Sequence, residues 1–334
     1  MSQQSSSPSK KTFWLAKAPG IAFNQEVFAE FQNDRGQSFG GGVRWDRHRK
    51  QAIATSSFPF LFSASDVLRL GGDVRDEAWR HTESGTDFTL QTASLSGSYE
   101  HSFRGRRSLS FHAGYRHQDS RFDQGTFPSQ SPHVVTLGLE WNQRIDLNPQ
   151  DSRQLHWATR LDQINLLGDT RQGTYRLATR VRVNWSLREK SRTNLGFSLQ
   201  GGISGDPLPL DDYFSLGVGP DHPLPLRAHT TLQDGRKGNN PLGREFALAN
   251  VEFSHRLLRW RFFEVKGFTF SDIALVGRPP FGASGQEWFH DAGGGLRLGF
   301  FGHEVVHLVL GWDLKNGSFN QWIGLPSRDP GVPQ

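Results

Sequence analysis

The stretch of residues 211–324 decides the fold, and three of its segments are LRAH (226–229), ANVEF (249–253) and FTFSDIAL (268–275). The first segment ends a long polar loop, and the other two alternate apolar with polar residues. In ANVEF, Asn250 and Glu252 share one face, and the apolar Val251 and Phe253 share the other. A period of two residues indicates β-strands. We therefore interpret this stretch as the closing half of a β-barrel.

The same alternation recurs earlier in the chain. It is clearest in four segments that each have one apolar and one polar face: residues 108–116, 135–142, 180–187 and 194–200. Trp141, Trp185 and Trp312 stand at the ends of such segments. Aromatic residues at strand ends are typical of the two interfaces of a membrane. No stretch shows helical periodicity over three turns, so the pattern predicts an all-β protein.

The composition excludes helical membrane insertion but is compatible with a barrel. Of the 334 residues 35% are hydrophobic, and no run of about 20 apolar residues, the length of a membrane-spanning helix, is present. The strands of a membrane barrel need only every second residue to be apolar. The chain contains 37 Gly, 26 Phe, 10 Trp and no Cys. The absence of Cys excludes a disulfide framework and a thiolate metal site.

Alternation alone does not separate a soluble β-sandwich from a membrane barrel, since the sandwich points its apolar face inward and the barrel points it toward lipid. The number of alternating segments and the aromatic segment ends favour the barrel. Sixteen strands of roughly ten residues, with their connections, need about 320 residues. We therefore predict an antiparallel transmembrane β-barrel of 16 strands over residues 21–325, between a disordered polar tail (1–20) and a polar C-terminal tail (326–334).

The connections alternate between short turns and longer loops, which is the habit of outer-membrane barrels. The segment 205–243 is far longer than an ordinary connection and contains six prolines. A loop of this length is expected to be functional, and we predict that it folds into the lumen. Residues 1–11 lack the apolar core of a signal peptide. We therefore expect the chain to be the mature membrane domain of a longer protein.

The basic balance of the chain does not indicate a nucleic-acid partner. The formal net charge is +5. A nucleic-acid interface needs a basic stripe with interleaved aromatic residues. Here the arginines recur at alternate strand positions or cluster in turns such as residues 47–50 and 104–107. We predict no binding of nucleic acid.

The segment HEVVH (303–307) matches the H-E-x-x-H pattern of zinc proteases. That chemistry needs a helix, on which residues four apart share a face. The residues that follow alternate as in a strand, where positions four apart lie about 13 Å from each other. We predict no metal site here and no cofactor. No nucleophile elbow, phosphate-binding loop or dinucleotide fingerprint is present, so the sequence favours a protein that is not an enzyme.

Three residues form the strongest candidate site: Arg227, Glu252 and Asp272. Charged side chains are costly on a lipid-facing surface, so both carboxylates are expected to point into the lumen. A loop arginine offers a bidentate donor for them. The alternative is that each carboxylate pairs with a local lumen arginine such as Arg297. Asn250 and Phe270 share the inward faces and are candidate supporting residues.

At these residues the chain resembles the barrel domain of the BamA/TamA superfamily of outer-membrane assembly factors, the bacterial surface antigen family. That family has a V-R-G-F/Y motif in a long external loop, matched by residues 226–229. Its next strands read N-x-E and F-x-D-x-G, matched by residues 250–252 and 270–274. A glycine-rich strand (293–297) and a final hairpin follow. The chain departs from the pattern at Ala228 and Ala274, where the family has glycine, and at His229, where it has an aromatic residue.

The resemblance implies a 16-stranded barrel in the bacterial outer membrane, with Arg227 held inside against Glu252 and Asp272. It implies that the protein inserts or translocates other outer-membrane or surface proteins. The expected partners are those client proteins, outer-membrane lipids and lipopolysaccharide, and periplasmic domains of a longer chain. An alanine in place of a left-handed glycine would be strained, which makes the docked shape of the loop a point to test. The alternatives are a passive or substrate-specific pore and a barrel-anchored hydrolase.

Overall fold

The computed structural model describes residues 26–45, 49–59, 63, 65–80, 87–103, 105–122, 133–148, 153–168, 172–186, 192–219, 224–233, 236–280, 285–301 and 303–324. The predicted tails, 1–20 and 326–334, lie outside the described residues. Among the described residues, none of the helical segments has the length and apolar character needed to span a membrane.

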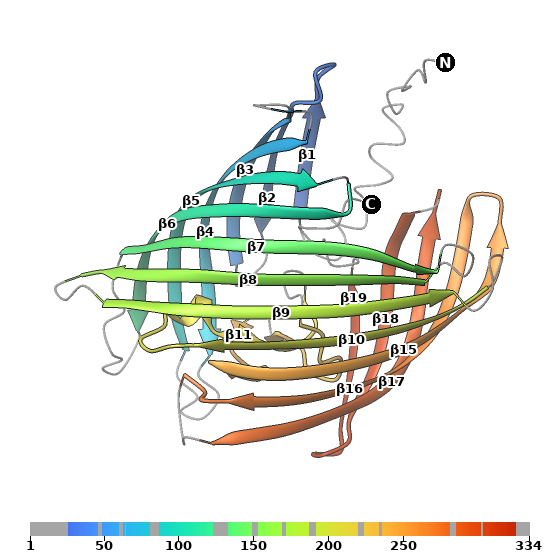
Figure 1. The fold of residues 1–334 in the computed structure, drawn as a ribbon. Coiled ribbons are helices and arrows are strands. Elements are labelled where there is room, and N and C mark those ends of the chain that lie inside the picture. The colour runs from blue at the N-terminus through green and yellow to red at the C-terminus, as the bar shows by residue number, and fades with distance from the viewer. Residues whose placement is uncertain are drawn as a thin grey trace.

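Long antiparallel strands dominate the fold (Figure 1). Each strand pairs with the next one in the chain, and β10 pairs with β15 across the long loop. The strands are β1 (Glu26–Gln32), β2 (Ser38–Trp45), β3 (Arg49–Pro59), β4 (Asp66–Arg80), β5 (Asp87–Phe103), β6 (Arg107–Phe122), β7 (His133–Asn148), β8 (Arg153–Leu167), β9 (Gln172–Ser186), β10 (Thr193–Ser204), β15 (Glu245–Trp260), β16 (Phe263–Gly277), β17 (Gln286–Phe300), β18 (His303–Asp313) and β19 (Ser318–Gly324).

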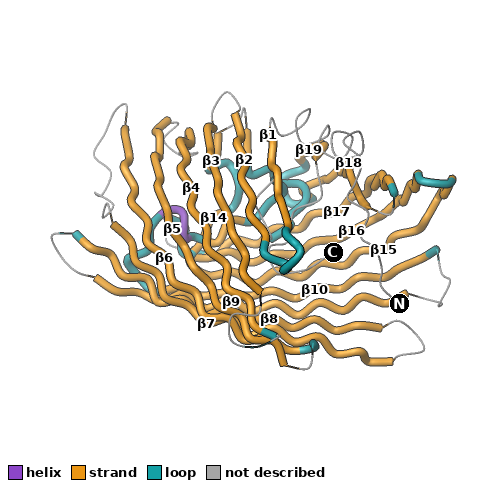
Figure 2. Tube along the Cα trace, turned by 90° about the horizontal axis from the view of Figure 1, so that it is seen from above, coloured by secondary structure: helices purple, strands orange, loops and turns teal. Residues whose placement is uncertain are grey.

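The sheet curls so that its first and last strands come toward each other (Figures 1 and 2). Within the described residues, fifteen strands form the meander, whereas sixteen were expected from the chain length. No ladder of hydrogen bonds joins β1 to β19 in the described part of the chain, so these strands form the seam. The prediction of an all-β antiparallel barrel is confirmed.

The strands are longer than the alternating sequence segments suggest. Trp141, predicted at a strand end, lies in the middle of β7, because β7 extends to Asn148. Trp185 and Trp312 do lie next to the ends of β9 and β18. The prediction for Trp141 was wrong because the alternation of β7 becomes less regular after Asn142, although its pairing with β8 continues.

The outer face of the sheet is apolar and the inner face is polar. Leu137 is 50% exposed and Trp312 is 48% exposed, whereas Ser110 and Gln200 on the inner faces of their strands are buried. A water-soluble sandwich has the reverse arrangement. A continuous apolar outer surface of this extent suits contact with lipid rather than water.

The long connection between β10 and β15 folds inside the barrel, as predicted. It contains a 3-10 turn, η1 (Leu210–Asp212), and the short strands β11 (Phe214–Ser215), β12 (Leu232–Gln233), β13 (Arg236–Lys237) and β14 (Leu242–Gly243). Its apolar residues form a buried cluster with the inner faces of β15, β16 and β17: Phe214, Leu216, Leu226, Phe246, Leu248, Ala274, Val276 and Phe289. Burial of this cluster stabilises the inserted position of the loop.

Candidate functional site

The tip of the lumen loop is bound to the barrel wall by Arg227. Its guanidinium donates two parallel hydrogen bonds to Asp272, from Nε to Oδ2 at 2.9 Å and from Nη2 to Oδ1 at 2.7 Å. The backbone N–H of Arg227 also donates to Asp272 Oδ2, at 3.1 Å. Asp272 lies on β16 and is fully buried. This bidentate geometry is the strongest form of arginine–carboxylate pairing.

Glu252 on β15 is shared between two arginines. Arg227 Nη1 donates to Glu252 Oε2 at 2.6 Å, and Arg297 Nη2 on β17 donates to the same oxygen at 2.7 Å. The loop arginine and the local lumen arginine were alternative partners in the sequence analysis, and both contacts are present. The sharing leaves Glu252 with a cation even where Arg227 is absent.

The two predicted supporting residues of β15 and β16 also contact the site. Asn250 Nδ2 donates to Asp272 Oδ1 at 2.9 Å and to the carbonyl of Pro225 at 2.8 Å, so it joins the loop backbone to the wall. The Phe270 ring lies under the guanidinium, with 3.9 Å between Arg227 Cζ and the ring centre. A cation–π contact of this kind adds to the attraction of a desolvated arginine.

Glycines provide the space that the site needs. A Cβ on Gly293 would lie 2.7 Å from Phe270 Cζ, so only glycine lets this ring lie flat on β17. A Cβ on Gly311 of β18 would lie 2.7 Å from the carbonyl oxygen of Arg227 and 2.9 Å from Ala228 Cα. The loop backbone therefore runs directly over β18 at a position where a side chain would displace it.

Two further carboxylates complete the site, and the sequence analysis did not identify them. Asn250, Asp272, Asp291 and Asp313 are direct partners across neighbouring strands, so they form one row from β15 to β18. Ala228 N–H donates to Asp291 Oδ2 at 2.6 Å. Asp291 and Asp313 are both buried. The loop tip thus crosses the strands over a row with one aspartate on each of β16, β17 and β18.

His229 faces the last two members of this row. Its Nδ1 lies 3.2 Å from Asp291 Oδ2, and its Nε2 lies 3.6 Å from Asp313 Oδ2. Asn320 on β19 donates to the carbonyl of Ala228 at 3.1 Å. Ala228 is not among the described residues with positive φ, so alanine is unstrained here. The His229 imidazole thus lies between two buried carboxylates of neighbouring strands.

Buried charge is balanced around Arg227. Burial by itself would lower the pKa of the guanidinium, but hydrogen bonds and charge from Asp272, followed by Glu252, raise it above its ordinary value. Arg227 therefore stays charged at every physiological pH. A charged guanidinium removed from water is stable only while its carboxylate partners are in place.

A second anchor holds the beginning of the loop to the opposite wall. Asp211 of η1 accepts a hydrogen bond from Arg75 Nη2 of β4 at 2.5 Å and from Gln118 Nε2 of β6 at 2.9 Å. Asp212 pairs with Arg116. Burial would raise the pKa of Asp211, but the charges of Arg75 and Arg116 outweigh it and hold this pKa below its usual range. Lys237 of β13 donates to Glu77 Oε2 at 2.8 Å.

The HEVVH segment lies on β18, as the strand pattern predicted. Glu304 contacts His307 at 3.0 Å and Lys266 at 3.0 Å. A register shift opposite Leu298 and Gly299 makes Val305 an extra residue in β18. This bulge brings Glu304 and His307, three positions apart, to the same side of the strand. The described residues hold no group of three or more His, Cys, Asp or Glu side chains arranged to bind a metal ion.

Comparisons with known proteins identify the fold. No family model matches the sequence, and no curated protein matches it. Solved structures do match: BamA from Haemophilus ducreyi lacking POTRA domains 1-3 (TM-score 0.63, 13% identity, 89% of this chain and 66% of that one) and CdiB from Escherichia coli (TM-score 0.64, 13% identity, 90% and 57%). CdiB from Acinetobacter baumannii is similar at TM-score 0.60 and 13% identity, over 89% and 55%.

This chain thus spans about two thirds of the BamA chain and little more than half of the CdiB chains. At 13% sequence identity to these structures, the similarity establishes the fold of this chain and not its activity. One architecture, a β-barrel with a loop inside its lumen, explains three features of the chain: the long polar loop, the apolar outer face and the antiparallel meander. The chain has the β-barrel fold of BamA and CdiB.

Proposed function

We propose that this protein is an outer-membrane barrel of the BamA/TamA type, which inserts or translocates other outer-membrane or surface proteins and performs no enzymatic chemistry. The observation that carries the proposal is the attachment of Arg227 to Asp272 and Glu252. The loop arginine, its position and its carboxylate partners resemble the pattern of that family, although Ala228 and His229 depart from its loop motif. The fold of the barrel matches BamA and CdiB.

The role proposed for Arg227, Glu252 and Asp272 is to lock the loop in the lumen. The loop crosses from β4 and β6, contacted by η1, to β16, β17 and β18, contacted by residues 227–229. Strands on both sides of the barrel are thereby tied to one segment. A barrel braced from inside keeps its shape even though no described hydrogen-bond ladder closes the seam between β1 and β19.

We propose that the protein lies in the bacterial outer membrane. Its apolar outer face would contact lipid and lipopolysaccharide, and its clients would be β-rich proteins delivered by periplasmic domains of a longer chain.

The test is the rate at which a client folds. Liposomes carrying the detergent-folded protein receive a small outer-membrane barrel protein diluted from urea, and the folded client is measured by its faster gel migration before boiling. We expect faster folding than in liposomes that carry an equal amount of a porin. Equal rates in the two preparations would contradict an assembly function.

Conductance in planar bilayers tests the alternative of a passive or substrate-specific pore. A lumen filled by residues 205–243 should conduct little and irregularly. Steady channels of uniform size, together with no acceleration of client folding, would favour the pore.

A further inference from the structure

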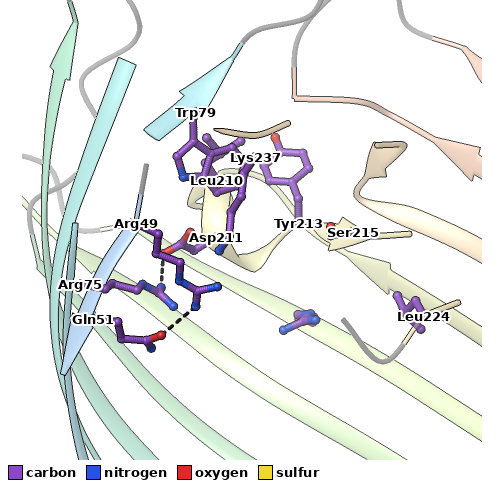
Figure 3. A pocket seen from close by; sticks show the side chains of 11 residues that line it. Arg49, Gln51, Arg75, Trp79, Leu210, Asp211, Tyr213, Ser215, Leu224 and Lys237 are labelled. Atoms are coloured by element: carbon purple, nitrogen blue, oxygen red, sulfur yellow. Dashed lines mark hydrogen bonds and ion pairs between the residues drawn. The ribbon is translucent and has the colours of Figure 1, made fainter. Parts of the chain in front are cut away.

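A cavity inside the barrel has no role in the lock. It has a volume of about 380 Å³ and lies between η1 and β13 of the loop and the inner faces of β3, β4 and β9 (Figure 3). Its lining contains four cationic side chains, Arg49, Arg75, Arg176 and Lys237, and one carboxylate, Asp211. It lies beside the second anchor and away from Arg227.

Three of the four cations have carboxylate partners. Arg49 Nε lies 3.0 Å from Glu77 Oε1, and Lys237 Nζ lies 2.8 Å from Glu77 Oε2. Arg75 is paired with Asp211, which itself lines the cavity (Figure 3).

Arg176 differs from the other three. Its guanidinium lies over the Phe214 ring, 4.7 Å from the ring centre. The charges of Asp212 and Asp162 act on it, but these two carboxylates form their ion pairs with Arg116 and Arg160. The Arg176 Nε is buried and has no hydrogen-bond partner among the described residues. Arg176 is half-buried as a whole, but a buried N–H donor without an acceptor, such as this Nε, costs free energy.

A second donor of the cavity lining is also unsatisfied. The indole Nε1 of Trp79 is buried without a hydrogen-bond partner in the described part of the chain. Indole N–H and guanidinium groups only donate, so both need a ligand that accepts. Together with the paired cations, the unsatisfied donors point to an anion rather than to a neutral or cationic ligand.

We propose that this cavity binds a phosphate-bearing anion, with the Arg176 guanidinium and the Trp79 indole N–H as its donors. The cationic groups reach the cavity from three sides: β3 and β4 form the first, β9 the second and β13 the third. This distribution suits a tetrahedral oxyanion better than a planar carboxylate. The volume is larger than a single ion needs and lies in the range of small-ligand sites, so a phosphate ester fits as well as free phosphate.

Calorimetric titration of the folded full chain tests the proposal. The protein is held in non-ionic detergent without phosphate or sulfate, and the probes are inorganic phosphate and dihexanoyl phosphatidic acid, whose headgroup is a phosphate monoester. We expect saturable binding that weakens about ten- to a hundredfold in Arg176→Gln, as for the loss of a charge-assisted hydrogen bond. Arg182→Gln, on the same inward face of β9 but outside the cavity lining, should bind like the wild type.

The two probes separate the sources of the phosphate group. Binding of both indicates a site for free phosphate or soluble esters, and binding of phosphatidic acid alone indicates a lipid headgroup. If Arg176→Gln does not give the compact unboiled band of a folded barrel, Arg176→Lys replaces it. This variant keeps the charge but loses the planar fork, so weaker binding is again expected. No saturable binding up to about 10 mM, or equal affinity in wild type and Arg176 variants, would overturn the proposal.

Discussion

Replacement of Arg227 by alanine should release the loop tip from the barrel wall. Arg227→Ala removes three side-chain hydrogen bonds, two to Asp272 and one to Glu252. Glu252 keeps its ion pair with Arg297 at 2.7 Å and is partly exposed, so the loss of its contact with Arg227 costs little free energy. Asp272 is fully buried, and among the described residues it keeps as donors Asn250 and the backbone N–H of residue 227. The cost therefore falls mainly on Asp272.

Removal of one partner of a buried ion pair costs about 3–5 kcal/mol. For the docked loop this corresponds to opening that is roughly 200- to 5,000-fold more frequent. The amides of residues 226–231 should exchange hydrogen for deuterium faster by that factor, while amides in the middle of β7 should not change.

A double-mutant cycle separates the ion pair from other effects of the substitution. Asp272→Asn removes the buried charge but keeps the shape of the side chain. In the double variant Arg227→Ala/Asp272→Asn, the docked loop should lose less stability than the sum of the losses in the two single variants, by about 1–3 kcal/mol. Arg297→Ala, which leaves Asp272 untouched, should have a smaller effect than Arg227→Ala. Unchanged exchange of residues 226–231 in Arg227→Ala would refute the lock.

Three further predictions follow from other parts of the loop. Gly311→Val should displace the loop tip, at a cost of about 1–3 kcal/mol for overpacking. Trypsin cleavage within residues 226–245 should then increase. Gly114→Ala, where a new Cβ meets its nearest atom at 3.8 Å, should have no such effect. His229→Ala should speed amide exchange at residues 228–231, since Asp291 and Asp313 lose their facing imidazole, and an unchanged rate would remove His229 from the site. The pKa of Asp211 is lowered in the folded protein. Its contribution to the stability of the docked loop is therefore present above the ordinary carboxyl pKa of about 3.9 and is lost as pH falls through the lowered value. Pepsin should cleave the loop start only at strongly acidic pH, and Asp211→Asn should remove this pH dependence.

The sequence by itself determined the strands and the side each residue faces. Backbone pleating sends alternate side chains to opposite faces, so the alternation in β7 and β9 could be read without any knowledge of neighbours. The cost of a charge in lipid then placed Glu252 and Asp272 inside. The resemblance of the loop motif added Arg227 as their partner.

Only the tertiary structure decided which inward residues meet. Asp272, Asp291 and Asp313 are far apart in sequence and become adjacent through the register of β16, β17 and β18. Register depends on turns, bulges and packing across strands, as at the extra residue Val305. The cavity around Arg176 likewise depends on where a loop of about forty residues turns inside the lumen. Alternation is a local property of each strand, whereas the contacts that form the lock and the cavity depend on the positions of all strands together.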